Sequence, residues 1–397
     1  MTKTDELKAA CAAKGLNYVG SRGNLRGPIY LIGEAPGESE DQANQPFVGA
    51  SGRELDRLLI EAGVDASVCC WTNSYKVRPP DNKLERLAEY GIPLTLFFEQ
   101  FMEELNVNKP TFICPLGATP LSLLCPSTIV KRTGHAEISK WRGSILHSPL
   151  LNWDHYVVPS FHPMFIFRAW DERQNAVLCL AKLAEEFNYW RTHGILQPLP
   201  QRQLIADPGA DDAIDFLRGI LQTPPQTVVS IDIENIGIYK GKYATKQRNR
   251  IPYVIGFSVS SDIGMSIGLA EYDRAKVIII WSLINAVLHQ KKQVGQNYYT
   301  HDLPWLQYIG FSPVIGNVHD TLVRHHVLWP ELSHKLDYQT FQYTREPYYK
   351  DEGKNWTIKE RQTMKRYNCK DVCVTLEVFQ RQEEEFQQRE AKDAFRL

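Results

Sequence analysis

Two acidic side chains interrupt an apolar run in the second half of the chain. Asp232 and Glu234 follow residues 228–231, and their spacing of two puts both on one face of a predicted strand. Carboxylates this close in apolar surroundings repel each other unless a cation lies between them. Oxygen ligands of this kind suit Mg²⁺ or Mn²⁺. The pattern therefore predicts a divalent-metal site, and the alternative is a strand end whose acids are solvated.

Later segments carry further candidates for the same site. Asp302 opens an amphipathic helix after a strand-like segment at residues 292–297. Tyr367 and Asp371 are four residues apart in a helical stretch, so the phenol and the carboxylate share one face of that helix. Tyr367 could instead be a core aromatic. Hydrolysis of a phosphodiester needs an activated water and relief of charge on the leaving oxygen, which a pair of divalent ions supplies.

The order of these motifs resembles a known nuclease family. An Asp-x-Glu strand, an Asn…Asp turn and a Tyr-x-x-x-Asp helix resemble the proofreading 3′–5′ exonuclease of family A DNA polymerases, in the tyrosine-bearing branch of the four-carboxylate superfamily. The resemblance covers residues 203–380. Segments at 319–321, 328–332 and 349–352 further resemble phage-type members.

This resemblance implies an RNase H-like fold with a mixed sheet and a role for each residue. Two Mg²⁺ or Mn²⁺ ions would be held by four acids, Asp232, Glu234, Asp302 and Asp371. Tyr367 would orient the attacking water, and Asn297 would contact the DNA. Four residues separate Asn297 from Asp302 where the family usually has three, so we expect a longer loop there.

The first half of the chain alternates apolar strands with helical stretches. Strands are expected at residues 28–32, 69–72, 111–114 and 156–158. Such alternation predicts an α/β/α sandwich with a largely parallel sheet, whose ligands bind beyond the carboxyl ends of the strands. Gly33 and Glu34 form a turn at the first of these ends, although such turns also join strands to helices where no ligand binds. Phe47 on the next turn could stack on a flat base or anchor the loop.

The polar segments at these strand ends resemble a second family. In order and spacing, residues 33–41, 45–52, 72–80, 116–118 and 158–163 resemble the family 4 uracil-DNA glycosylases and the glycosylase-like domain that precedes the exonuclease in some phage DNA polymerases. The likeness covers roughly residues 25–190. It implies that Glu34 positions or activates the attacking water, beside Gly33 in the substrate site.

The same resemblance assigns the remaining pocket residues. Phe47 would stack on a flipped-out uracil, Asn73 would read its Watson–Crick edge, and His162 would stabilise charge growing on uracil O2. Candidate phosphate contacts, each of which could equally be a solvated surface charge, are Lys76, Arg78, Arg142 and Arg168.

One feature of that family is missing from the sequence. Its members bind a four-iron, four-sulfur cluster through four cysteines, two of them in an N-terminal Cys-x-x-Cys. Here Cys11 is followed by Lys14, and Val77 takes the place of the cysteine before Arg-Pro-Pro. We therefore predict no iron–sulfur cluster. Without it, the first half is either an active glycosylase or a module that grips uracil or duplex DNA without cutting.

Length and composition bound these hypotheses. The chain has 397 residues, 43% of them hydrophobic, and a net charge of -1, which argues against binding by bulk positive charge. We expect a glycosylase-like domain at residues 1–193, a linker at 194–202 and an exonuclease domain at 203–397. No run of about eighteen apolar residues and no secretion signal is found, so we expect a cytoplasmic protein, in the host cytoplasm if a phage encodes it.

The sequence supports two hypotheses of different class. The first is a phage-type DNA-processing enzyme that excises or recognises uracil and trims 3′ ends of DNA. The second is an accessory, proofreading subunit of a split family A polymerase, in which the first half only holds DNA. Because no thumb, palm or fingers follow the exonuclease motifs, we expect no polymerase activity, and a charged helix at residues 381–392 could contact a separate polymerase or be solvated.

Overall fold

The computed structural model describes residues 1–129, 133–235, 253–353 and 360–394. The chain divides into two compact units, Met1–Leu199 and Pro200–Leu397, and the division falls within the segment expected to be a linker. Among the described residues, no helix combines the length and the apolar character needed to cross a membrane.

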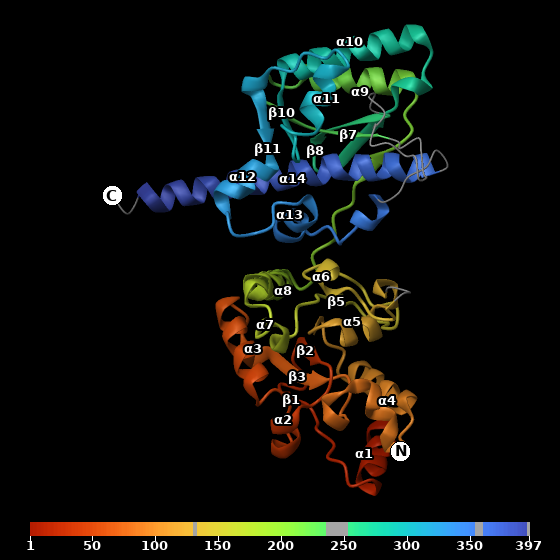
Figure 1. Ribbon diagram of the computed structural model, residues 1–397, viewed down its shortest axis with the longest axis vertical. Helices are drawn as coiled ribbons and strands as arrows, with labels where there is room; N and C mark the ends of the chain where they lie inside the picture. The colour runs from red at the N-terminus through yellow and green to blue at the C-terminus, as the bar shows by residue number, and fades with distance from the viewer. Residues whose placement is uncertain (130–132, 236–252, 354–359, 395–397) are drawn as a thin grey trace, which may run out of the picture. The chain divides into compact units, whose positions relative to one another are not determined.

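The first unit contains a five-stranded sheet in the order β1-β3-β2-β4-β5 (Figure 1). Its strands are β1 (Arg22–Gly23), β2 (Ile29–Gly33), β3 (Cys69–Asn73), β4 (Phe112–Pro115) and β5 (Tyr156–Val157). Strand β2 pairs in parallel with β3 and β4, β4 pairs in parallel with β5, and the edge strand β1 is antiparallel to β3. The expected α/β sandwich with a largely parallel sheet is confirmed.

Helices cover both faces of this sheet. Successive residues of a strand therefore point into two different cores, one on each face. The helices are α1 (Lys3–Ala13), α2 (Glu38–Ala43), α3 (Ala50–Glu61), α4 (Leu94–Asn108), α5 (Ala118–Leu124), α6 (Ile138–Trp141), α7 (Pro163–Ile166) and α8 (Arg173–His193). In β2, Ile29 and Leu31 pack with residues of α3 and α8, whereas Tyr30 and Ile32 pack with residues of α4 and α5. The sandwich leaves the carboxyl ends of the strands to the loops that follow them.

The second unit contains a six-stranded mixed sheet in the order β11-β10-β7-β8-β9-β6 (Figure 1). Its strands are β6 (Gln203–Ile205), β7 (Val228–Glu234), β8 (Val254–Ser260), β9 (Ile263–Ile267), β10 (Lys292–Gly295) and β11 (Val318–Asp320). Strand β7 is parallel to β10 on one side and antiparallel to β8 on the other. The mixed sheet expected for an RNase H-like fold is confirmed.

Helices pack on both faces of the second sheet. They are α9 (Ala210–Gln222), α10 (Arg274–Gln290), α11 (Asp302–Tyr308), α12 (Thr321–Leu328), α13 (Leu336–Tyr343) and α14 (Arg361–Ala394). Figure 1 shows α9 and α10 on one side of the strands and α14 crossing the other. In β7, Ile231 and Ile233 pack into the core formed with α9 and α10. The alternation of a strand therefore turns Asp232 and Glu234 toward α14.

Candidate active sites

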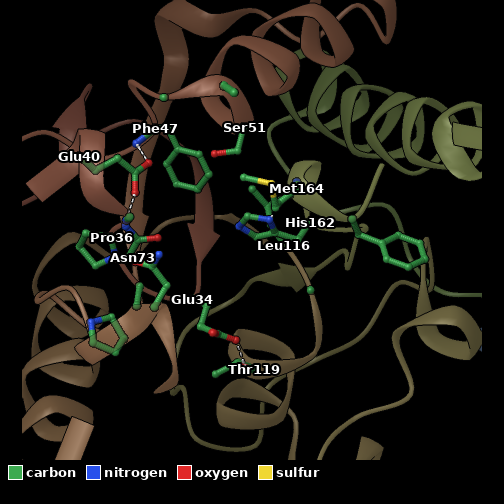
Figure 2. A pocket seen from close by; sticks show the side chains of 18 of the residues that line it. Glu34, Pro36, Glu40, Phe47, Ser51, Asn73, Leu116, Thr119, His162 and Met164 are labelled. Atoms are coloured by element: carbon green, nitrogen blue, oxygen red, sulfur yellow. Dashed lines mark hydrogen bonds between the residues drawn. The ribbon is translucent and has the colours of Figure 1, made fainter. Parts of the chain in front are cut away.

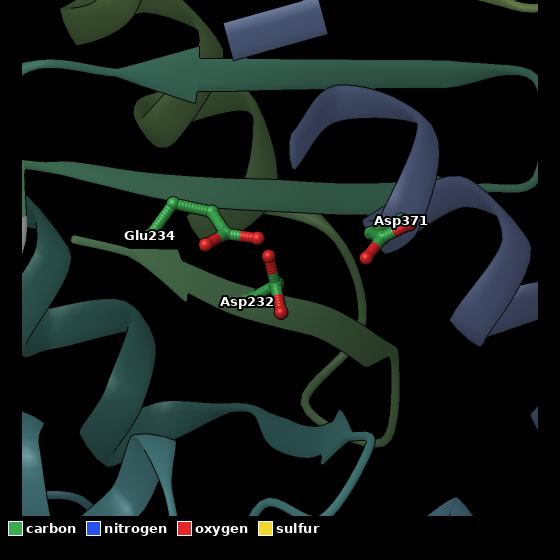
Figure 3. A group of neighbouring side chains, drawn as sticks. All are labelled: Asp232, Glu234 and Asp371. Carbon is green, nitrogen blue, oxygen red and sulfur yellow. The ribbon is translucent and has the colours of Figure 1, made fainter. Parts of the chain in front are cut away.

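Three acids converge on the face of the second sheet that α14 covers. Carboxylate oxygens of Asp232, Glu234 and Asp371 all lie within 4.8 Å of one another (Figure 3). Strand β7 supplies the first two, and α14 supplies Asp371, which is buried while the other two remain partly open to solvent. The opening leaves a path for a cation to reach a set of oxygen donors suited to Mg²⁺ or Mn²⁺.

The electrostatics of this group also favour a bound cation. Burial raises the pKa of Asp232 well above its usual range, and the neighbouring carboxylates of Glu234 and Asp302 raise it further. Burial and the Asp371 carboxylate raise the pKa of Glu234 to about 8. Acids that hold their protons near neutral pH are acids whose charges lack sufficient compensation. A divalent cation would supply that compensation.

Asp302 lies beside this group without belonging to it. The residue is buried at the start of α11, and one carboxylate oxygen accepts the backbone N–H of Ile233 at 2.9 Å. Its other oxygen lies 3.5 Å from His301 Nδ1. The structure therefore brings three of the four predicted metal ligands together and places the fourth next to the strand that carries two of them.

Asn297 occupies a different setting from the one expected. Strand β10 ends at Gly295, and Asn297 is exposed with a positive φ of 56°. Its side-chain oxygen accepts the hydroxyl of Thr300, and its backbone N–H donates to Asp320 at 2.9 Å. The predicted strand is thus two residues too long, because a left-handed turn begins the loop that carries the chain to Asp302.

Tyr367 packs beside the acids and is held by residues that the sequence argument did not assign. Its phenol oxygen accepts a hydrogen bond from Lys350 at 2.8 Å. Burial, reinforced by Asp371, raises the pKa of Tyr367 well above its usual range, so the phenol keeps its proton. Tyr349 donates its hydroxyl to Asp371 at 2.6 Å. Tyr349 and Lys350 lie in a segment that resembled phage-type members, but no pattern in it indicated these contacts.

A further residue missed by sequence reasoning is Asn368. This buried amide donates to the Asp232 carboxylate at 2.7 Å and accepts the Ser266 hydroxyl at 2.8 Å. Gly256 pairs with Asp232 across β7 and β8, and a Cβ there would lie 2.6 Å from the Asn368 side-chain oxygen. The glycine therefore makes room for the amide that orients Asp232. The available signal was its spacing, because Asn368 lies three residues before Asp371 and so shares a helix face with it.

A cavity of about 700 Å³ opens in the first unit where its parallel strands end (Figure 2). Among its lining residues are five of the predicted site residues, Glu34, Phe47, Asn73, His162 and Arg168. Gly33 lies behind them, since a Cβ on it would come within 2.3 Å of Asn73 Oδ1 and 2.7 Å of the Phe47 ring. Only glycine lets the amide and the ring approach the end of β2 this closely.

Phe47 is fixed in place by Glu40. Phe47 has a positive φ of 57°, which is uncommon for a bulky residue. The buried Glu40 carboxylate accepts the backbone N–H of Phe47 and, at 2.8 Å, that of Gly37 (Figure 2). Sequence reasoning missed this role, although an acid three residues after a glycine at a helix start is a capping signal.

The polar groups in the cavity have specific hydrogen-bonding states. Asn73 is buried, and its side-chain nitrogen has no hydrogen-bond partner among the described residues. His162 Nδ1 accepts the backbone N–H of Met164 at 3.1 Å, so the neutral ring carries its proton on Nε2. Burial lowers the pKa of His162 to about 4, which keeps the ring neutral at pH 7. Glu34 accepts the hydroxyl of Thr119 (Figure 2).

Comparison with known proteins finds relatives of the first unit. The family profile described as "Uracil DNA glycosylase superfamily" matches residues 21–184. A type-4 uracil-DNA glycosylase of Thermotoga maritima is 34% identical over 160 residues, which cover 38% of this chain and 72% of that protein. Through its first unit, the chain belongs to the type-4 uracil-DNA glycosylase family. A type-4 enzyme of Archaeoglobus fulgidus is 43% identical over 107 residues, or 25% of this chain and 49% of that protein.

The second unit matches a different family. The profile described as "3'-5' exonuclease" matches residues 210–387, so the glycosylase domain is fused to a metal-dependent 3′–5′ exonuclease domain. Among solved structures, the catalytic core of RRP6 from Trypanosoma brucei is similar, with 18% identity and a TM-score of 0.36 over 49% of this chain and 52% of that one.

One predicted phosphate contact of the glycosylase domain is wrong. Lys76 is fully buried, and its ammonium pairs with Glu104 at 2.5 Å and donates to Thr72. A buried ion pair of this kind cannot reach a DNA phosphate without leaving a charge unpaired. Arg168 lines the cavity.

Two further arginines of the glycosylase domain keep surface or packing contacts. Arg78 donates to Asn82 at 2.9 Å and lies 3.5 Å from Glu38, and the Arg142 guanidinium lies 5.7 Å from the centre of the Phe161 ring.

The region where the family resemblance would place an iron–sulfur cluster is apolar in this glycosylase domain. Cys11 and Val77 are buried in one cluster with Leu7, Leu87, Ile92, Leu96 and Phe97. Burial raises the pKa of the Cys11 thiol to about 11, so it is not a thiolate at neutral pH. Cys69, Cys70, Cys114 and Cys125 lie in the two cores that flank the sheet. One protonated thiol does not fit a cluster that needs four thiolate ligands.

Proposed function

We propose that the second unit removes nucleotides from the 3′ end of DNA, with two Mg²⁺ or Mn²⁺ ions held by Asp232, Glu234, Asp302 and Asp371. The observation that carries the proposal is the convergence of three acids, from a central strand and a distant helix, within 4.8 Å. When bound, divalent ions would supply an activated water and relieve charge on the leaving 3′ oxygen.

The chain's own residues then position the reacting groups. Asn368 fixes one oxygen of Asp232 and leaves the other for a ligand. The phenol of Tyr367 keeps its proton and accepts a hydrogen bond from Lys350. Its O–H can therefore donate a hydrogen bond, to Asp371 and, we propose, to the attacking water. Asn297, exposed on the loop before α11, would contact the DNA strand.

This proposal is tested by the direction and cofactor dependence of digestion. A single strand labelled at its 5′ end should shorten stepwise from the 3′ end with Mg²⁺, and a strand blocked by a 3′ phosphorothioate linkage should resist. Digestion that persists in EDTA, or that starts from the 5′ end, would contradict the assignment.

We propose that the first unit excises uracil from DNA. The observation that carries this proposal is the buried Asn73 amide, whose N–H groups lack a partner in the described part of the chain. A polar group buried without a partner costs about 1–3 kcal/mol, which a ligand can recover. Uracil offers O4 to accept from this amide and N3–H to donate to its oxygen, while Phe47 offers a ring on which the base can stack.

The remaining groups suit the bond-breaking step. As the bond between uracil N1 and the sugar breaks, its electron pair moves onto the base, and the Nε2–H of His162 donates to uracil O2. A water held by Glu34 attacks the sugar carbon and gives its proton to that carboxylate. Thr119 keeps Glu34 in one orientation for this role. Arg168, which lines the cavity, and Arg78 would contact the flanking phosphates.

We also propose that this glycosylase domain folds without an iron–sulfur cluster. Support comes from the apolar side chains around Cys11 and Val77, which fill the region that ligands of an iron–sulfur cluster would occupy. Purified protein should be colourless and contain no iron.

Release of uracil from a 5′-labelled strand, with thymine in the same context as the control, tests excision by the first unit. Tight binding of uracil-containing DNA without release would leave only the binding role.

The cellular role that we propose is proofreading, in a phage, beside a separate family A DNA polymerase. Support comes from the resemblance of residues 319–321, 328–332 and 349–352 to phage-type exonucleases. Primers with a mismatched 3′ end should be shortened faster than matched primers, because a frayed end reaches the acids as a single strand. Equal rates on both primers would indicate general degradation.

A further inference from the structure

A lysine side chain binds one of the three acids of the nuclease centre. The ammonium of Lys350 donates to both carboxylate oxygens of Asp371, at 2.8 and 2.6 Å, and to the phenol oxygen of Tyr367 at 2.8 Å. Asp371 is also within 4.8 Å of the Asp232 and Glu234 carboxylates. The ammonium therefore shares a ligand with the cation that these acids are arranged to hold.

The fold builds this position. Tyr349 is buried and bonded to Asp371 at 2.6 Å, which anchors the chain immediately before Lys350. Gly353 lies flat against Tyr367, because a Cβ on it would be 2.5 Å from the ring carbon Cζ. The ammonium lies 5.1 Å from the centre of the Tyr349 ring and 4.7 Å from that of Tyr367.

Two aromatic rings and a carboxylate thus surround the charge, and only 16% of the Lys350 side chain is exposed. A surface lysine that moves freely in water would not be confined in this way.

We propose that Lys350 is a resident cation of the exonuclease centre, which compensates the acids before metal binds and competes with divalent metal for Asp371. The inference rests on the metal-dependent nuclease proposed above. The three acids repel one another, and one ammonium offsets part of that repulsion in the metal-free protein. A positive charge at the same carboxylate opposes an incoming divalent ion. Lys350 is thus a positioning residue that keeps the empty centre assembled at a cost in metal affinity.

The chain contains a matched control for this charge. Lys370 is adjacent to Asp371 in sequence and is exposed to a similar degree, 18%. Its ammonium lies 3.4 Å from Glu352 and 3.7 Å from Glu346, and 4.8 Å from the Tyr349 ring. It carries the same charge next to the same segment, yet its ion pairs are with acids outside the metal group. A general change of surface charge would affect both lysines alike.

The direct test is calorimetric titration of the full chain with Mn²⁺ in the absence of DNA. Lys350→Met should bind Mn²⁺ at least about tenfold more tightly than the native chain, because one opposing charge is removed. Lys350→Arg keeps the charge and should stay near the native affinity. Lys370→Met should change the affinity by less than about threefold.

A second readout follows the metal-free protein. Without Mn²⁺, the melting transition of Lys350→Met should fall by about 5 °C or more, and saturating Mn²⁺ should restore it. Lys370→Met should show neither effect. An unchanged or weaker Mn²⁺ affinity in Lys350→Met overturns the resident-cation proposal while native Mn²⁺ binding leaves the nuclease assignment intact. Failure of the native chain to bind Mn²⁺ would overturn the metal site itself.

Discussion

The two sites of this chain prepare for their ligands in opposite ways. In the glycosylase domain, loops at the ends of parallel strands present two neutral groups for the base. They are the buried Asn73 amide, whose nitrogen has no partner in the part of the chain that the structure describes, and the His162 ring, which burial keeps uncharged. In the exonuclease domain, a strand and a helix bring three like charges together, and burial raises the pKa of Asp232 well above its usual range. A missing hydrogen bond selects a neutral base, whereas unbalanced charge selects a cation.

The strongest way to break this contrast is to remove charge from the exonuclease centre. Asp232→Asn should lower Mg²⁺-dependent digestion by about a thousandfold, because a ligand and its charge are lost together. The metal-free variant should be no less stable than the native chain, since one repelling carboxylate is gone. Rates on single-stranded DNA and metal-free thermal melting measure the two effects.

Asp215→Asn is the control, because Asp215 is exposed on α9 and paired with Arg218 at 3.6 Å. It should leave both quantities unchanged. Full nuclease activity in Asp232→Asn would refute the metal site.

The matching change in the glycosylase pocket is Asn73→Leu. Loss of the amide should lower uracil release by about a hundredfold or more, as the site can no longer read the edge of the base. Stability should hold or rise, because the buried N–H groups have no partner to lose among the described residues. Asn188→Leu, on the exposed side of α8, should affect neither measurement. If Asn73→Leu still excised uracil at the native rate, Asn73 would not be the residue that recognises the base.

Acid should weaken the glycosylase domain through His162. Its folded-state pKa of about 4 lies below the ordinary 6.5, so the unfolded chain binds the proton more readily between those values. The free energy of unfolding should therefore fall as pH drops through this window, by about 2 kcal/mol after allowance for partial exposure of the ring. Denaturant unfolding at pH 7 and pH 4 should show this loss in the native chain but not in His162→Gln. Equal losses in both proteins would contradict it.

The smallest expected effect concerns the apolar side chains that surround Cys11 in the glycosylase domain. Cys11→Ala should cost about 1 kcal/mol and preserve uracil release, because the thiol acts there as a buried apolar group. Phe97→Ala in the same cluster should cost about 3–5 kcal/mol. If the native chain absorbed visible light and Cys11→Ala did not, Cys11 would instead be a ligand of an iron–sulfur cluster.

Local sequence patterns were sufficient to predict which strands and helices carry the residues of both sites. The alternation of residues 228–234 indicated that Asp232 and Glu234 share a face, and helical spacing indicated the same for Tyr367 and Asp371. Apolar runs located the parallel strands of the first unit to within one or two residues. These features depend on neighbours close in sequence, which is why sequence periodicity reveals them.

Contacts between distant segments were not predictable in the same way. Lys76 lies in a loop after a strand, where a lysine is usually exposed to solvent. Here it is buried, because its ammonium pairs with Glu104 of the distant helix α4. Lys350 contacts Asp371 across 21 residues of sequence, and no spacing rule encodes that contact. The same holds for the exposed turn at Asn297. Such placements are decided by tertiary packing, so they become visible only in the folded chain.

The central claim is that one chain carries a metal-dependent nuclease and a metal-independent glycosylase. The most direct measurement uses a single strand, labelled at its 5′ end and containing one uracil, incubated first with EDTA and then, in a parallel sample, with Mg²⁺. The account predicts one alkali-sensitive break at the uracil in EDTA, and stepwise shortening from the 3′ end only with Mg²⁺. A strand that stays intact at the uracil in EDTA, or that shortens without metal, would contradict it.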